Sequence, residues 1–92
     1  MINISYDPKK SRANVDTRGL SFESAREFEM AEALIVEDMR KVYSERRFQA
    51  LGYIGHRLHM LVFTPRDGNV HVISLRKANA REVTRYEQTK SE

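Results

Sequence analysis

Three apolar-rich segments in the second half of the chain follow one another with almost no chain between them. Arg47–Ile54 and Arg57–Thr64 are separated by Gly55-His56, which suits a tight reversal. Arg57–Thr64 and Val70–Arg76 are separated by Pro65–Asn69, whose proline, Asp-Gly pair and asparagine are typical of a hairpin loop. Because strands joined by such short connections pair antiparallel, the sequence predicts an antiparallel meander.

The first half of the chain carries helix signals. Asp7-Pro8 predicts a helix start, because aspartate accepts hydrogen bonds from the free amides and proline suits the first helical position. We expect a helix over Pro8–Thr17, ending before Gly19 as a left-handed cap. Ser21 is expected to cap a second helix that reaches about Ala33. The apolar residues of that helix recur at every third position: Phe22, Ala25, Phe28 and Ala31.

Weaker signals complete the order of elements. Met1–Ser5 alternates apolar and polar residues and is compatible with a short strand, and the apolar run Leu34–Val36 predicts another. Met39–Glu45 is polar and is expected to be a loop, while a last helix is expected from near Asn79 to about Gln88. The predicted order is βααββββα.

This order predicts an α+β domain of two layers. We expect an antiparallel four-stranded sheet, with two N-terminal helices and one C-terminal helix on one of its faces. The other face is expected to stay partly open, and Arg47 and Arg76 are candidates to point toward it. A length of 92 residues suits a single domain spanning residues 1–92.

Composition excludes several classes of protein. The chain has no cysteine, which excludes disulfides and cysteine-based metal sites. No apolar run reaches the roughly 20 residues that span a bilayer, and the first ten residues lack the apolar stretch of a signal peptide. We therefore expect a cytoplasmic protein without membrane contacts.

Charge is distributed unevenly along the chain. Of 16 Lys/Arg and 13 Asp/Glu, residues 1–45 hold 7 and 9, and residues 46–92 hold 9 and 4. The halves therefore carry −2 and +5, which sum to the net charge of +3. A basic half favours an anionic partner, although a solvated charged surface gives the same counts.

Motifs for metal, nucleotide or serine chemistry are missing from the sequence. The histidines His56, His59 and His71 lack the spacing of a helical metal pair, and neither a glycine-rich phosphate loop nor G-x-S-x-G occurs. No metal ion or cofactor is therefore expected. The remaining arginines suit RNA cleavage, in which the RNA 2′-hydroxyl attacks the adjacent phosphate and the protein positions the strand and stabilises charge. A carboxylate, histidine or tyrosine would move the proton.

The main candidate residues lie in the last predicted strand and helix. Arg76 closes a strand at an end that often lines a cleft, which favours a phosphate ligand over a surface ion pair. Glu82 and Tyr86 lie four residues apart on one helix face. Glu82 is either catalytic or, through its spacing from Asn79, a capping-box residue. Tyr86 is either catalytic or packed on the sheet.

Two further pairs of arginines are close in sequence. Arg46 and Arg47 are adjacent, so in a regular strand only one of them faces the cleft, and the other is expected to pair with Glu45 or meet solvent. Arg81 and Arg85 lie four residues apart, on the helix face next to the candidates just described.

Seven features of the chain occur in a characteristic order and spacing. They are Y-D-P-K-K at Tyr6–Lys10 with Asn14 following, G-L-S-F-E at Gly19–Glu23, E-R-R-F-Q-A-L-G at Glu45–Gly52, L-V-F-T at Leu61–Thr64, V-I-S-L-R-K-A at Val72–Ala78, Glu82 and Tyr86. With this ordered set, nearly the whole chain resembles the BrnT family of bacterial toxins, which are paired with BrnA antitoxins.

The resemblance implies a RelE-like fold, RNA cleavage without a metal ion, and inhibition by a tightly bound BrnA-type antitoxin. The antitoxin carries a DNA-binding domain that represses the shared operon, so the toxin would meet the DNA operator only through its partner. By position, the implied active residues are Arg76, Glu82, Tyr86 and Arg47 or Arg46. Residues expected to contact RNA are Arg46, Arg66, Lys10 and Lys77.

The chain departs from the family pattern at three places. Thr17-Arg18-Gly19 stands where the family usually has Lys-His-Gly, so Arg18 could keep a phosphate contact there but could not act as a base. Pro65 stands where an acid is common, and Ser74-Leu75-Arg76 replaces Ser-Ala-Arg. The missing histidine leaves a second function open: a non-catalytic module that binds RNA or a partner on the same scaffold, with salt-sensitive binding and no cleavage.

Overall fold

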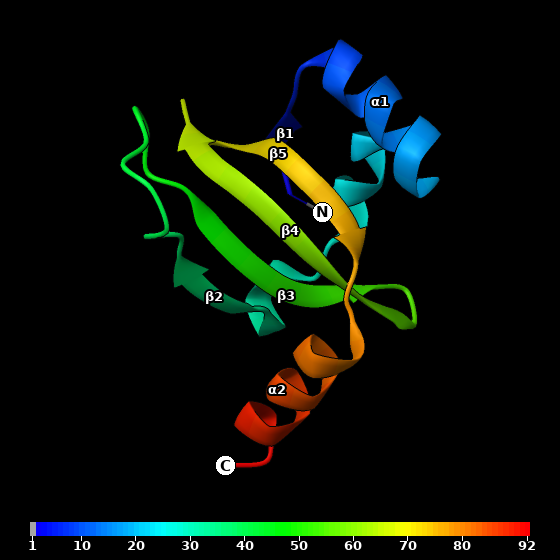
Figure 1. The fold of residues 1–92 in the computed structure, drawn as a ribbon, viewed down its shortest axis with the longest axis vertical. Helices are drawn as coiled ribbons and strands as arrows, with labels where there is room; N and C mark the ends of the chain where they lie inside the picture. The colour runs from blue at the N-terminus through cyan, green and yellow to red at the C-terminus, as the bar shows by residue number, and fades with distance from the viewer. Residues whose placement is uncertain (1) are drawn as a thin grey trace.

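The computed structural model describes residues 2–92 and shows an α+β fold (Figure 1). Its centre is a mixed sheet with the strand order β1-β5-β4-β3-β2. In chain order the elements of that range are β1 (Ile4–Ser5), α1 (Pro8–Arg18), the 3₁₀-helices η1 (Phe22–Glu27) and η2 (Met30–Glu32), β2 (Leu34–Glu37), β3 (Phe48–Ile54), β4 (Arg57–Arg66), β5 (Asn69–Lys77) and α2 (Ala80–Lys90).

The antiparallel meander of the second half is confirmed. β3, β4 and β5 pair antiparallel in sequence order, and β2 adds antiparallel to β3. The β4–β5 hairpin is tighter than predicted, because both strands extend into the expected loop Pro65–Asn69. The turn is reduced to Asp67 and Gly68, whose φ angles of 52° and 76° are the combination that a type I′ turn requires.

The prediction of a four-stranded, purely antiparallel sheet is wrong. A fifth strand, β1, pairs parallel to β5, with Ile4 opposite Val70. The amide of Val70 also donates to the carbonyl of Asn3 at 2.9 Å. Ile4 is buried in the core, and this burial stabilises a strand of only two residues. The predicted strand Met1–Ser5 is thus shortened, and its Met1 lies outside the described residues.

The second predicted helix is also corrected, since residues 21–33 form two 3₁₀-helices rather than one α-helix. Phe28 separates η1 from η2 with an extended backbone, φ −68° and ψ 129°. A 3₁₀-helix has about three residues per turn. The three-residue spacing of Phe22, Ala25 and Phe28 therefore suits this geometry, and all three side chains are buried. Ser21 caps η1 as expected.

The first helix begins as predicted and extends one residue further. Asp7 accepts from a backbone amide at 2.9 Å, and Gly19 ends the helix with φ 71°. Asn14 is buried in α1 and donates to the carbonyls of Leu20 at 2.9 Å and Leu75 at 2.8 Å. Asn14 therefore has a structural role, tying α1 to the connection before η1 and to β5.

Contrary to the prediction, the helices do not share one face of the sheet. The 3₁₀-helix η1 packs on the face that carries Leu61 and Leu75. The C-terminal helix α2 packs on the other face, where Tyr86 joins a second buried cluster with Leu51 and Met60. The chain enters this cluster directly after β5, because Ala78 is buried in it.

Helix α2 covers only one end of its face (Figure 1). Further along the same face, four neighbouring residues of β3, β4 and β5 remain partly exposed. They are Gln49, Val62, Ser74 and Arg76. We call this surface the open face. Neither α-helix within residues 2–92 is long and apolar enough to cross a membrane.

Candidate functional site

Arg76 lies on the open face and is held by Glu82 at the start of α2. Its Nη1 and Nη2 donate to the two carboxylate oxygens at 2.7 and 2.8 Å, and Nη1 also donates to the carbonyl of Lys77 at 3.3 Å. Within residues 2–92, no group accepts from Nε of Arg76. Because the side chain is 30% exposed, the Nε–Nη2 edge of the guanidinium is free to bind an anion side-on.

Glu82 holds both Arg76 and the end of its own helix. Its carboxylate accepts from the amide of Asn79 at 2.9 Å, and the Asn79 side chain accepts from the amide of Glu82, so the predicted capping box is confirmed. Hydrogen bonds from Arg76, followed by that from Asn79, lower the pKa of Glu82 below its ordinary value of 4.5. A carboxylate with a lowered pKa is a weak proton acceptor, so the geometry makes Glu82 the residue that orients Arg76.

This ion pair predicts that stability depends on pH. Since the pKa of Glu82 is lowered in the folded protein, the pair stabilises the fold above the unfolded pKa near 4.5 and loses this contribution as the pH falls through the folded pKa. We therefore expect Glu82→Gln to be less stable than the native chain near pH 7, with a smaller difference below about pH 4. Urea unfolding of both proteins measures it, and an equal difference at both pH values would contradict the pairing.

Arg47 lies on the same side of the sheet as the open face. It continues the alternation of β3, two residues before Gln49. Its guanidinium stacks on the ring of Tyr43, with Cζ 4.3 Å from the ring centroid. None of the ion pairs within residues 2–92 involves Arg47. The ring therefore orients a guanidinium whose charge is not neutralised.

The loop from 38 to 47 is organised by the buried carboxylate of Asp38. This group accepts from Nε and Nη2 of Arg40 at 2.8 and 2.7 Å and from the hydroxyl of Tyr43 at 3.1 Å. Its hydrogen bonds with Arg40 hold the pKa of Asp38 far below the usual range. Asp38 thus fixes the aromatic ring beneath Arg47. It also fixes Arg40, whose positive charge opposes the rise in the pKa of Arg76 that Glu82 causes.

The sequence-based candidates do not include Arg40, Asp38 or Tyr43. All three lie in or beside a stretch whose polarity predicts only a loop, and burial of an acid in a loop leaves no periodic pattern. The one local signal is D-M-R, in which an acid precedes an arginine by two residues. Aspartate at such a position commonly accepts from nearby backbone and side-chain groups.

Arg46 and Arg47 point to opposite faces, as their adjacency predicts. The guanidinium of Arg46 lies 5.2 Å from the ring centroid of Phe48, and its Nη2 donates to Glu37 at 2.8 Å. Of the two expectations for this arginine, the pairing with Glu45 is wrong, because Glu37 on the neighbouring strand lies on the same face as Arg46, and the exposure to solvent is confirmed, because the Arg46 side chain is 73% exposed. Arg46 is not part of the open face.

Arg66 and Lys10 lie near His71. Arg66 ends β4, and the end of the sheet where β4 passes into β5 is distant from α2 (Figure 1). Arg66 pairs with Glu45, and its Nη1 lies 3.3 Å from Nε2 of His71. Burial, followed by the charge of Arg66, lowers the pKa of His71. A neutral ring accepts from Arg66 at Nε2 and donates from Nδ1 to the hydroxyl of Ser5, 2.9 Å away.

Tyr86 and Lys77 lie away from the open face. Tyr86 is 7% exposed, its hydroxyl donates to the carbonyl of Glu32 at 3.0 Å, and its ring meets that of Tyr53 edge-on at 5.6 Å. The structure thus packs Tyr86 against the sheet, one of its two predicted roles. Lys77 is exposed and follows Arg76 on β5, so the two side chains point to opposite faces.

The remaining histidines form no metal centre with their neighbours. His59 is buried, its Nδ1 lies 2.8 Å from the carbonyl of Arg57, and burial lowers its pKa. His56 is exposed in the β3–β4 turn. Within residues 2–92, no group of three or more His, Cys, Asp or Glu side chains is arranged to hold a metal ion.

Comparison with family models gives a match over most of the chain. The model of a family described as the ribonuclease toxin, BrnT, of type II toxin–antitoxin systems matches residues 6–82. The matched range includes Arg47, Arg76 and Glu82, and it ends before Tyr86. No curated protein matches the chain.

Proposed function

The chain belongs to the BrnT family of ribonuclease toxins of type II toxin–antitoxin systems, and from this premise we propose that it cleaves RNA on the open face without a metal ion. The RNA 2′-oxygen attacks the adjacent phosphorus, and the bond from phosphorus to the 5′-oxygen breaks. The products are a 2′,3′-cyclic phosphate and a 5′-hydroxyl, which takes up a proton in exchange for the one that the 2′-hydroxyl loses.

The free edge of Arg76 is the observation that carries this proposal. Glu82 occupies the Nη1–Nη2 edge, which leaves the Nε hydrogen and the second hydrogen of Nη2 on the other edge without an acceptor within residues 2–92. A non-bridging phosphate oxygen pair matches such a fork. Because Arg76 is already oriented before RNA binds, its donors stabilise the negative charge that develops on the phosphorane with little reorganisation.

The remaining candidates take supporting roles. Arg47 lies two strands away from Arg76, and it is four residues from the position on β3 that is level with Arg76. Ordinary strand spacings therefore separate the Cα atoms of Arg47 and Arg76 by roughly 16 Å. We assign it to another phosphate of the same RNA strand. Tyr86 supports the position of α2 from within the core. Arg66 and Lys10 extend the basic surface at the end of the sheet that is distant from α2. Arg46 and Lys77 lie outside the surface on which we place the RNA.

The partner follows from the family. A type II toxin is paired with an antitoxin, and we propose a BrnA-type antitoxin that carries the only contact with operator DNA. An acidic or amphipathic segment that folds on binding would cover the unneutralised arginines. Since the proposed substrate is cellular RNA, the cytoplasm is the proposed site of action.

Cleavage of RNA by the purified chain in excess EDTA is the direct test. We expect fragments that end in a 2′,3′-cyclic phosphate, because the nucleophile is the RNA itself and the charge is stabilised by arginine. A matched oligonucleotide with a single 2′-deoxy substitution at the cleavage position serves as the control and should stay intact. Loss of all cleavage on metal removal would overturn the mechanism. RNA that is bound but remains whole would support a non-catalytic module instead.

A further inference from the structure

Two arginines on α2 lie outside every ion pair described so far. Arg81 and Arg85 are one helical turn apart and exposed, and no carboxylate within residues 2–92 pairs with either of them. By contrast, five other arginines of the chain are each held by an acid: Arg26, Arg40, Arg46, Arg66 and Arg76. The α2 pair therefore differs from these five arginines in having its charge available to a ligand.

Helix stability does not explain this pair. Like charges four residues apart repel each other and cost a few tenths of a kcal/mol. Arg81 also lies in the first turn of α2, where the helix dipole disfavours a cation. Glu82 is the one acid three or four residues from either arginine, and its carboxylate is already occupied by Arg76 and the helix cap. The sequence thus concentrates positive charge where the fold alone would not.

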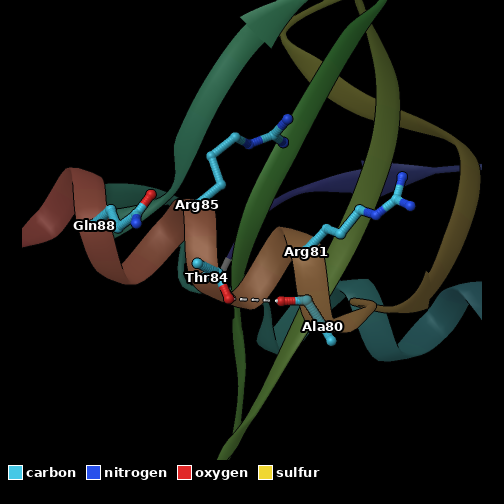
Figure 2. Close-up of a pocket in the computed structure, with 5 residues that line it drawn as sticks. All are labelled: Ala80, Arg81, Thr84, Arg85 and Gln88. Carbon is cyan, nitrogen blue, oxygen red and sulfur yellow. Dashed lines mark hydrogen bonds between the residues drawn. The ribbon is translucent and has the colours of Figure 1, made fainter.

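The two side chains border a shallow pocket. Figure 2 shows Arg81 and Arg85 extending to the same side of the helix, with Thr84 and Gln88 between and beyond them. The pocket holds about 350 Å³, and its lining is completed by Ala80, so no acidic residue takes part. The Thr84 hydroxyl already donates to the Ala80 carbonyl at 3.1 Å. The donors left for a ligand are two guanidinium groups and one carboxamide, which suits a phosphodiester.

The pocket lies close to the Arg76 site. Arg85 lies three residues from Glu82 in α2, so the two side chains are neighbours on the helix surface, and Glu82 holds Arg76 at 2.7 Å. We propose that Arg81 and Arg85 bind the phosphates of single-stranded RNA next to the phosphate held by Arg76. The inference rests on the proposed function and extends its site from the sheet onto α2.

Binding of a labelled single-stranded oligodeoxynucleotide at several salt concentrations tests this subsite, because such a probe binds without being cleaved. We expect the double variant Arg81→Gln/Arg85→Gln to bind on the order of tenfold more weakly. The slope of log affinity against log salt should also fall by about 1.4, since a single strand releases about 0.7 counterion per phosphate contact.

The matched control is Lys9→Gln/Arg12→Gln, which removes the same charge from exposed positions on α1. An equal loss of affinity in both double variants would overturn the subsite, because the effect would then follow net charge alone. An unchanged slope in the α2 variant, or a loss of antitoxin binding without a loss of oligonucleotide binding, would also overturn it. If RNA is cleaved normally while the slope is unchanged, the subsite fails and the proposed function stands.

Discussion

Arg76→Lys is expected to lower the rate of RNA cleavage by about 10²–10³-fold, the usual effect of removing one donor that stabilises a developing oxyanion. Arginine binds Glu82 with one edge and leaves the other edge for phosphate. An ammonium group is a point charge without a second fixed edge, so it cannot satisfy both partners in one geometry. Because the lost interaction strengthens in the transition state, the effect should fall mainly on kcat.

Single-turnover cleavage of a short RNA measures this effect, with circular dichroism as a check that the variant is folded. Arg12→Lys, on the exposed surface of α1, is the matched control and should cleave at the native rate. A rate for Arg76→Lys within about threefold of the native chain would contradict the role of the fixed guanidinium edge, because positive charge alone would then suffice at this position.

The strands were predictable because their signals are local. Alternation from Arg47 to Arg76 and two short breaks are enough to specify three antiparallel strands, since no other pairing connects them so briefly. The hairpin tip at Asp67-Gly68 follows from residues that tolerate positive φ. Caps at Asp7 and Asn79 likewise depend on neighbours in sequence, and both are confirmed.

The errors concern contacts between distant segments. β1 becomes a strand only because β5, more than sixty residues later, offers it a parallel edge. Residues 21–33 form 3₁₀-helices because Phe28 leaves helical geometry and packs under the sheet. The side of the sheet taken by α2 depends on where Ala78 is buried. None of these choices is encoded in periodicity within a single segment.

The candidate site was predictable at the level of residues rather than contacts. Arg76 and Arg47 are both on the side of the open face, as the alternation suggests, and Glu82 has its capping role. The sequence did not predict that Glu82 both caps α2 and pairs with Arg76, because this pairing depends on the angle at which α2 leaves β5. The stacking of Arg47 on Tyr43 likewise depends on a loop that Asp38 folds through side-chain hydrogen bonds.

Close packing explains one residue that the sequence pattern leaves unexplained. Gly52 lies in β3 with no positive φ, so backbone conformation does not require a glycine there. A Cβ at this position would lie 2.6 Å from Cζ of Phe28 and within 3.1 Å of two further ring carbons. Phe28 is itself only 3% exposed. The bare backbone of Gly52 thus provides the space for a buried aromatic ring.

Gly52→Ala is therefore expected to destabilise the protein by about 1–3 kcal/mol through overpacking, lowering the melting temperature by roughly 10 °C. In an open strand the same change would stabilise by about 0.5–1 kcal/mol, because alanine restricts the unfolded chain more than glycine does. The sign of the effect thus tests the contact.

Thermal melts of Gly52→Ala, Phe28→Leu and the double variant form a cycle that isolates the contact between residue 52 and the ring of Phe28. Removing the ring makes room for the methyl group, so the double variant should be more stable than the sum of the two single changes predicts by more than about 1 kcal/mol. Simple additivity would show that the ring of Phe28 moves freely, and that Gly52 is not needed for its position.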